Sequence, residues 1–338
     1  MLNDTTVSSA DEAMVEMKYS GTKRYNNYST FIKSKFEQRV QKVSLDTGFT
    51  CPNRDGSKGV GGCTYCNNNS FNPDYCKPQK SISQQLQEGI DFFAKKYESQ
   101  QYLAYFQAYT NTYSDFELLK ELYTEAVSHP GVVGMVIGTR PDCINEDIIN
   151  FLQELSKDYY ISLEFGVEST INKTLDLINR CHSYEETQQA YEMAANKGLD
   201  LGAHMIIGLP GETREDILNH AKALSKLPIK TLKLHQLQII KNTMMAHQLK
   251  HTPEMFSLFE VDEYIDLMTE FIALLRPDII LERFISESPK ELLIAPIWDG
   301  IKNYAVVDKI DKLLKQKNLW QGKNYQGKNY QGKNYQSN

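Results

Sequence analysis

Strand-like and helix-like segments alternate along most of this 338-residue chain, and this alternation limits the possible folds more than any other feature. Short apolar runs predict six strands, at residues 41–46, 102–109, 132–139, 160–167, 201–209 and 231–240. Apolar residues three and four positions apart predict helices between them, at 82–97, 116–128, 146–157, 184–197 and 212–226. Such alternation is typical of a parallel sheet with right-handed crossovers. We expect an α/β fold, either a partial β/α barrel or an open doubly wound sheet, with its chemistry at the carboxyl ends of the strands.

The two ends of the chain depart from this pattern. Residues 1–20 are polar and acidic, and the segment 319–338 repeats the sequence Gln-Gly-Lys-Asn-Tyr. Neither end has much to bury, so we predict a disordered extension on each side of a domain at 21–318. Within that domain, helices at 261–275 and 301–316 and one further strand at 278–286 predict a short, mainly helical C-terminal extension.

The composition is that of an ordinary globular protein. The chain has 37 basic and 43 acidic residues, a formal net charge of −6, and 41% hydrophobic residues. No apolar run approaches the roughly 18 residues of a membrane span, and the acidic N-terminus does not resemble a secretory signal. Six cysteines in a chain of this length do not form a disulfide framework. We therefore expect a cytoplasmic protein with no membrane association.

Three cysteines lie close together in the loop after the first strand. Cys51, Cys63 and Cys66 have the spacing C-x11-C-x2-C, and glycines around them let the backbone curl closely around a bound group. Four ligands close an iron–sulfur cluster, so three thiolates would leave one iron open to a small molecule. A zinc site that recruits Cys76 or a histidine is the main alternative. Ordinary buried cysteines without a metal are the third.

The flanking sequence resembles the radical S-adenosylmethionine (radical SAM) superfamily. The aromatic Tyr65 precedes the last of the three cysteines, and Gly-Leu-Pro-Gly-Glu follows the fifth strand. The long first cysteine spacing resembles the branch of the elongator catalytic subunit, and most closely its YhcC-type family. The matching stretches follow one another along most of the chain: GFTCPNRDGSKGVGGCTYCNNNSF, YLAYFQAYTNTY, VIGTRPDCI, LEFGVES, INRCHSY, HMIIGLPGET and KLHQLQIIKNT.

This resemblance implies a partial (βα)6 radical SAM barrel with S-adenosylmethionine (SAM) across its carboxyl-terminal face. Cys51, Cys63 and Cys66 would hold a [4Fe-4S] cluster, and the open iron would bind the amino and carboxylate groups of SAM. One electron from the cluster would cleave the sulfonium and release a 5′-deoxyadenosyl radical. An electron donor such as flavodoxin or ferredoxin is implied as well.

The resemblance also assigns roles to residues at the ends of the strands. Arg180 would clamp the carboxylate of SAM, since a planar guanidinium suits two-pronged binding. Glu168 would contact the ribose or an amino group, and the turn at Ile207 and Gly208 would receive the adenine. The other implied cofactor contacts are Tyr65, Gln107, Thr110 and Asn111.

The third and fourth strands carry the polar residues nearest the expected substrate. Arg140, Asp142 and Cys143 end the third strand, where a substrate would face the radical, and we predict that they are catalytic. Glu164 and Glu168 differ by four positions and so lie on the same side of the fourth strand. A buried carboxylate there is costly without a partner, so we expect a ligand or a base beside it.

The relatives named above imply tRNA as the substrate, with the C5 side chain of the wobble uridine as the target. The chain ends too early for the acetyltransferase domain of the elongator subunit, so we expect a transferase or lyase that modifies an existing substituent. Basic segments at 20–42 and 226–251 are the predicted phosphate contacts, and we single out Lys23, Lys33, Lys35, Lys230 and Lys233. A radical enzyme acting on a small metabolite or protein is one alternative, and a non-enzymatic zinc-binding module is the other.

Overall fold

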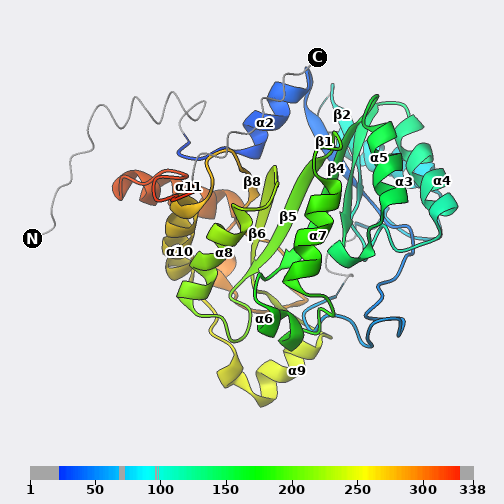
Figure 1. Ribbon diagram of the computed structural model, residues 1–338. Coiled ribbons are helices and arrows are strands. Elements are labelled where there is room, and N and C mark those ends of the chain that lie inside the picture. The colour runs from blue at the N-terminus through cyan, green and yellow to red at the C-terminus, as the bar shows by residue number, and fades with distance from the viewer. Residues whose placement is uncertain (1–22, 68–72, 96, 98, 328–338) are drawn as a thin grey trace, which may run out of the picture.

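One curled sheet of seven parallel strands forms the centre of the molecule (Figure 1). The computed structural model describes residues 23–67, 73–95, 97 and 99–327. The strands lie side by side in chain order: β1 (Val40–Leu45), β2 (Gln101–Phe106), β3 (Val132–Thr139), β4 (Tyr160–Glu168), β5 (Asp200–Ile207), β6 (Thr231–Gln236) and β8 (Ile280–Arg283). A doubly wound sheet reverses its strand order at a switch point, whereas this order runs in one direction. The prediction of a partial α/β barrel is therefore confirmed.

The crossover helices pack against the sheet through the apolar faces that the sequence predicted. They are α3 (Ile82–Ala94), α4 (Phe116–Ser128), α5 (Glu146–Leu155), α7 (Tyr184–Ala194) and α8 (Arg214–Leu224). In α4, for example, Tyr123 meets Phe106 of β2 edge-on, with ring centroids 5.0 Å apart. Each of these helices begins at a side-chain cap; the carboxylate of Asp115, for instance, accepts bonds from the first backbone amides of α4. The caps fix where each helix starts, and so fix the length of the loop that precedes it.

The chain after β6 departs from the prediction in two ways. The strand predicted at 231–240 is interrupted, because β7 (Ile239–Ile240) leaves the main sheet and pairs antiparallel with β9 (Leu293–Ala295). The strand predicted at 278–286 is present as β8, and it joins the main sheet parallel to β6. The C-terminal part thus adds a seventh strand as well as helices. Its helices are α9 (Met244–His251), α10 (Val261–Leu274) and α11 (Asn303–Gln316), with short 3-10 turns at Pro253–Met255 and Trp298–Gly300.

The predicted boundary of the C-terminal tail at residue 319 is too early. Trp320 and Gln321 are buried, and the amide of Gln321 donates to the backbone oxygens of Arg276 (2.9 Å) and Ile279 (2.8 Å). The first repeat therefore packs on the domain, because its glutamine satisfies carbonyl groups that would otherwise be buried without partners. The predicted extension at 1–20 and the last repeats lie outside the described residues.

Helix α2 (Tyr28–Lys35) lies across the amino ends of the strands, at the opposite end of the sheet from α6 (Asn172–Leu177) and α9 (Figure 1). Lys35 forms an ion pair with Asp200 at the start of β5 (3.4 Å), and Phe36 packs edge-on against Tyr160 at the start of β4. Lys230 lies over the ring of Phe31 in the same region. These predicted phosphate contacts are therefore remote from the carboxyl ends of the strands.

Lys233 does not belong to the predicted basic surface either. Its side chain is buried inside the half-barrel and contacts Glu164, with 2.5 Å between Nζ and Oε2. A lysine in the middle of a strand that faces the inside of a barrel cannot reach a polynucleotide backbone. The prediction that Lys233 contacts phosphate is therefore wrong.

Candidate active site

A cavity of about 210 Å³ opens at the carboxyl ends of the strands, and the three clustered cysteines form part of its wall. Because β1 to β6 are parallel, the loops that follow them meet at this edge and bring distant sequence segments together. The predicted site residues that line the cavity are Cys51, Cys63, Tyr65, Cys66, Gln107, Thr110, Arg140, Glu168 and Arg180. Most of the predicted site is therefore assembled in one place.

The loop that carries the cysteines folds into a short hairpin held against the turn after α6. Asp55 and Val60 form an isolated bridge within the spacer between Cys51 and Cys63. The side-chain amide of Asn179 donates to the backbone oxygens of Val60 (3.1 Å) and Gly62 (2.8 Å). These bonds satisfy the polar backbone of an otherwise irregular loop, and so give the long spacer one defined shape.

Polar groups surround the sulfur atoms of the cysteines. The hydroxyl of Thr110 lies 2.9 Å from Cys51 Sγ, and Asn53 donates its amide to Cys63 Sγ (3.2 Å). Burial raises the pKa of the Cys66 thiol to about 11 and also raises that of Cys51, so iron binding must displace protons from these thiols. Donors already directed at sulfur suit thiolates that carry negative charge in a cluster.

Arg180 links the cysteines to the end of β4. Its Nη1 lies 3.5 Å from Cys63 Sγ, its Nη2 donates to the backbone oxygen of Gly166 (2.6 Å), and Nη2 lies 3.6 Å from a Glu168 oxygen. A Cβ atom at Gly166 would lie 2.5 Å from Arg180 Nη2, so a side chain at this position would displace the guanidinium from where it lies. The backbone of Glu168 has a φ of 64°, and a register shift between β4 and β5 accompanies this turn of the chain.

Two buried guanidinium atoms indicate that the cavity suits an anionic group. Within the described part of the chain, Arg180 Nε and Arg140 Nη1 are buried without a hydrogen-bond partner. Both arginines line the cavity next to the cysteines. A carboxylate is the group that guanidinium donors bind best, and SAM carries one. The residues present therefore fit an iron–sulfur cluster with SAM beside it.

The structure does not place Cys76 where a zinc ion bound by the other three cysteines would need its fourth ligand. Cys76 is buried near Asp46 and Lys80 and does not line the cavity that contains the other three cysteines. Among the described residues, no three histidine, cysteine or acidic side chains converge tightly enough to bind a single metal ion. The three thiols instead share one wall, as ligands of separate irons do in a cluster.

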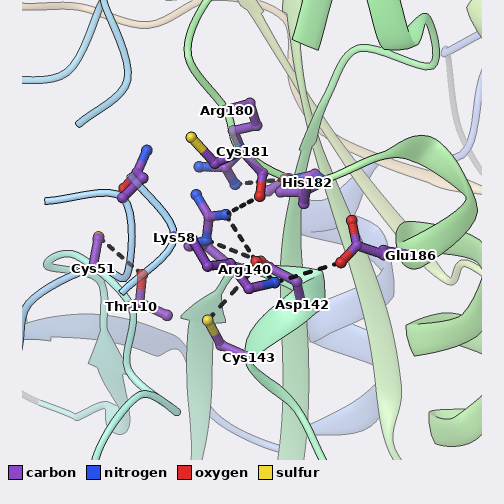
Figure 2. Close-up of polar contacts among 12 residues, drawn as sticks. Cys51, Lys58, Thr110, Arg140, Asp142, Cys143, Arg180, Cys181, His182 and Glu186 are labelled. Carbon is purple, nitrogen blue, oxygen red and sulfur yellow. Dashed lines mark hydrogen bonds and ion pairs between the residues drawn. The ribbon is translucent and has the colours of Figure 1, made fainter. Parts of the chain in front are cut away.

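Asp142 and Cys143, which we predicted to be catalytic, lie outside the lining of the cavity. Both belong to a 3-10 turn at Pro141–Cys143 and line a separate hollow, so only Arg140 of this group lines the cavity. Asp142 accepts two bonds from Arg140 (2.9 Å each) and one from Lys58 (2.7 Å), as Figure 2 shows. Burial alone would raise the pKa of Asp142, but the two cations lower it to about 2. Asp142 thus anchors the cysteine loop.

Asn111, Ile207 and Gly208 also lie outside the cavity lining. Asn111 is fully buried, and its amide donates to the backbone oxygen of Gly138 (2.8 Å). Ile207 packs into the core between sheet and helices, because alternate residues of a strand face opposite sides. Its neighbour Ile206 faces the cavity instead. Of the two isoleucines before the turn predicted for adenine, Ile206 therefore lines the cavity and Ile207 does not, and the adenine contact itself stays a prediction.

A charged network inside the half-barrel went largely unpredicted. Glu164 accepts bonds from Lys233 (2.5 Å), Lys42 (3.3 Å) and the hydroxyl of Tyr105 (3.2 Å). Burial alone would raise the pKa of Glu164, but Lys233 and Lys42 hold it well below its usual value. We expected one basic group beside Glu164, and the structure places two there, Lys233 and Lys42. Charged residues in the middle of otherwise apolar strands were the sequence signal that could have identified both lysines.

A curled parallel sheet with three cysteines and two arginines lining the cavity at its carboxyl edge indicates an iron–sulfur enzyme whose small cofactor carries a carboxylate. A model of the radical SAM superfamily matches residues 50–224, and a model of the radical SAM C-terminal domain matches residues 229–316. The chain belongs to the radical SAM superfamily, and a [4Fe-4S] cluster and SAM are its cofactors.

Relatives extend the match to most of the chain. The uncharacterized protein YtqA of Bacillus subtilis is 33% identical over 90% of this chain and 94% of its own length. Protein YhcC of Escherichia coli is 34% identical over 82% of this chain and 88% of its own, which confirms the predicted YhcC-type relationship. A tRNA uridine(34) acetyltransferase of Methanocaldococcus infernus is 25% identical over 55% of this chain and 34% of its own. Among solved structures, Elp3 of Methanocaldococcus infernus shares the fold with a TM-score of 0.63 and 18% identity, over 84% of this chain and 64% of that one.

The described helices carry no candidate for a membrane span. None of them combines the length and the apolar composition that crossing a bilayer requires.

Proposed function

We propose that this radical SAM enzyme modifies tRNA at the C5 side chain of the wobble uridine. The observation that carries the proposal is the depth of the cavity, which continues from the cysteines to polar side chains on β4, β5 and β6. A space of this kind below the cofactor position suits a polar base better than an apolar metabolite. The relative named as a tRNA uridine(34) acetyltransferase and the shared fold with Elp3 support the same substrate class.

The cluster and SAM, when bound, supply the radical that removes a hydrogen atom from the substrate. The protein's own groups hold and shield these cofactors. Cys51, Cys63 and Cys66 bind the cluster, while Arg180 and Arg140 offer donors to the carboxylate of SAM. Flavodoxin or ferredoxin would supply the electron.

Cations at the mouth of the half-barrel support a polynucleotide substrate. Lys241 and Lys250 are exposed, and they belong to the segment that leads from β7 through α9. This segment borders the cysteine loop, since Met245 N donates to the oxygen of Thr64 (2.9 Å) and Asn67 donates its amide to the oxygen of Lys241 (2.9 Å). Phosphates bound here would lie beside the cavity entrance.

The decisive experiment compares two pools of tRNA. Modified nucleosides are measured in tRNA from a strain with the intact gene and from a strain that lacks it. The purified enzyme, with its cluster reduced anaerobically, is then given each pool. We expect one wobble uridine derivative to be missing from the tRNA of the strain that lacks the gene. Only the tRNA of that strain should increase the consumption of SAM by the purified enzyme. Identical nucleosides in both strains, with no effect of either pool, would favour the small metabolite or protein substrate.

A further inference from the structure

Two histidines at the floor of the cavity have no part in the cofactor roles described above. His204 lies on β5 and His235 on β6, the neighbouring strand, and their ring centroids are 5.2 Å apart. Both line the cavity that contains the cluster cysteines. They lie deeper along their strands than Ile206 and Leu237, which also line it near the carboxyl edge.

Arg283 determines which nitrogen of His235 carries the proton. Arg283 Nη2 lies 2.5 Å from His235 Nε2. A guanidinium only donates hydrogen bonds, so Nε2 must accept, and the single proton of a neutral ring is then on Nδ1. Burial, followed by the charge of Arg283, lowers the pKa of His235 well below its usual value, which keeps the ring neutral. His235 therefore offers an N–H donor at Nδ1.

Glu164 favours the other tautomer in His204, with the proton on Nε2. One oxygen of Glu164 lies 3.5 Å from His204 Nε2. His204 Nε2 is buried and makes no hydrogen bond, but the negative charge of Glu164 beside it favours the tautomer with the proton on Nε2, which leaves Nδ1 as an acceptor. Burial lowers the pKa of His204, so this ring is neutral as well. Across the described residues, Nδ1 of neither ring is bonded to another group or buried out of reach of a ligand.

The groups around the two rings hold them in place. Lys233 and Tyr105 fix Glu164 behind His204. Next to His235 on the same strand, Gln236 exchanges two hydrogen bonds with the backbone of Ser286 (2.9 and 3.0 Å). A donor and an acceptor set rigidly side by side recognise a ligand edge that has the complementary pair.

We propose that His204 and His235 form a subsite for the imide edge of a uracil base. His235 would donate to a carbonyl oxygen of the base, and His204 would accept from its N3–H. The proposal rests on the proposed function, which supplies the uridine. What it adds is the identity of the residues that bind the base. The unpaired wobble base of an anticodon loop can be turned outward into a pocket. With the base held in the same position, cytosine would place its N3 acceptor against the acceptor of His204, so it would bind more weakly.

Small nucleotides test the subsite without any assumption about tRNA. The probes are uridine 5′-monophosphate, 3-methyluridine 5′-monophosphate and cytidine 5′-monophosphate, each bound to anaerobic protein that carries its cluster and SAM. Ligand-detected NMR measures the three affinities. We expect the wild type to bind the uridine nucleotide about tenfold more tightly than either of the others, as expected for one buried hydrogen bond. His204→Phe and His235→Phe should each lose this preference.

A matched control separates the subsite from general damage. His247→Phe changes an exposed histidine on α9 and should keep the wild-type preference. All three variants should keep their iron content and their affinity for SAM. Where a phenylalanine variant does not fold, the comparison of uridine with 3-methyluridine nucleotides on the wild type still tests the proposal.

The outcomes distinguish this inference from the proposed function. Equal binding of the three nucleotides to the wild type, or an unchanged preference in both histidine variants, would overturn the subsite. Weaker SAM binding in the variants would overturn it too, because the rings would then contact the cofactor's adenine. A clear preference for uridine 5′-monophosphate in a protein that modifies no tRNA would support the subsite and remove the proposed function.

Discussion

The amine of Lys58 lies 2.7 Å from a carboxylate oxygen of Asp142, and this contact ties the spacer between the first two cluster cysteines to the end of β3. Arg140 holds the same carboxylate through two bonds, and Lys58 also reaches Glu186 on α7 (3.4 Å), as Figure 2 shows. The long cysteine spacing is thus matched by an anchor outside the loop. The anchor explains how a glycine-rich segment can place Cys51 and Cys63 on one wall.

Replacing Asp142 by Asn should destabilise the protein in a pH-dependent way. The lowering of this pKa from 3.8 to about 2 corresponds to a stabilisation of about 2 kcal/mol at neutral pH. A lowered pKa stabilises the folded state above the unfolded value, and this contribution is lost as the pH falls towards the folded value. Urea unfolding should show the full difference between wild type and variant from pH 7 to 5, and a smaller one below about pH 4. A difference that does not change with pH would contradict this, and Asp308→Asn on the exposed side of α11 should have no measurable effect.

The cluster ligands are tested one cysteine at a time. Cys51→Ala, Cys63→Ala and Cys66→Ala should each abolish the reductive cleavage of SAM, because each removes one of three iron ligands. The matched controls replace the cysteines outside the cavity lining, Cys76, Cys143 and Cys181, by Ala. These should retain iron, sulfide and cleavage activity. Loss of iron from the Cys76 variant as complete as from the first three would argue for a four-cysteine site.

The hydroxyl of Thr110 should raise the reduction potential of the cluster. It lies 2.9 Å from Cys51 Sγ, and a donor to a ligand sulfur stabilises the more negative, reduced state. Thr110→Val keeps the shape and removes the donor, so the midpoint potential should fall by about 50 mV in a titration followed by EPR. Thr112→Val removes a hydroxyl that bonds Thr139 instead, and it serves as the control. Equal potentials in all three proteins would rule out this role of Thr110.

Prediction from the sequence was most accurate where a periodic pattern or a strong local motif determines the structure. Apolar spacing located the six predicted strands, and the cysteine motif located the mouth of the half-barrel. It failed where one residue of strand register decides which way a side chain points, as for Ile207 and its neighbour Ile206. The prediction that Lys233 contacts phosphate was also wrong, because a charge count along the chain cannot distinguish a solvated lysine from one that neutralises a buried glutamate.

Arg180 should control the affinity for SAM without being needed for the iron. Its guanidinium is buried beside Cys63, and it has an Nε atom without a partner. Arg180→Lys keeps the charge but loses the planar pair of donors, so the affinity for SAM should fall roughly tenfold or more, as measured by anaerobic calorimetry. The iron content should be unchanged, and Arg214→Lys on the exposed face of α8 should bind SAM normally. Wild-type affinity in Arg180→Ala would exclude the carboxylate role.

The position of α2 changes which lysines should contact tRNA. Lys33 and Lys35 lie at the amino end of the sheet, whereas Lys241 lies beside the cysteine loop at the other end and Lys250 lies in the last turn of α9, whose first turn contacts that loop. A tRNA whose wobble base enters the cavity must place its anticodon-loop phosphates near the second pair. Each phosphate contact releases counterions, so binding should weaken with salt, with a slope that depends on the number of contacts.

The salt dependence of tRNA binding therefore compares two double variants of equal charge. Replacing Lys241 and Lys250 by Gln should weaken binding and flatten the salt slope by about one per lost contact, whereas replacing Lys33 and Lys35 by Gln should leave the slope unchanged. SAM cleavage in the absence of tRNA should survive both changes, because it needs only the cysteines and the cavity wall. A slope that flattens only when Lys33 and Lys35 are replaced would place the tRNA at the amino end of the sheet. The wobble base could not then reach the cluster, and tRNA would have to be abandoned as the substrate.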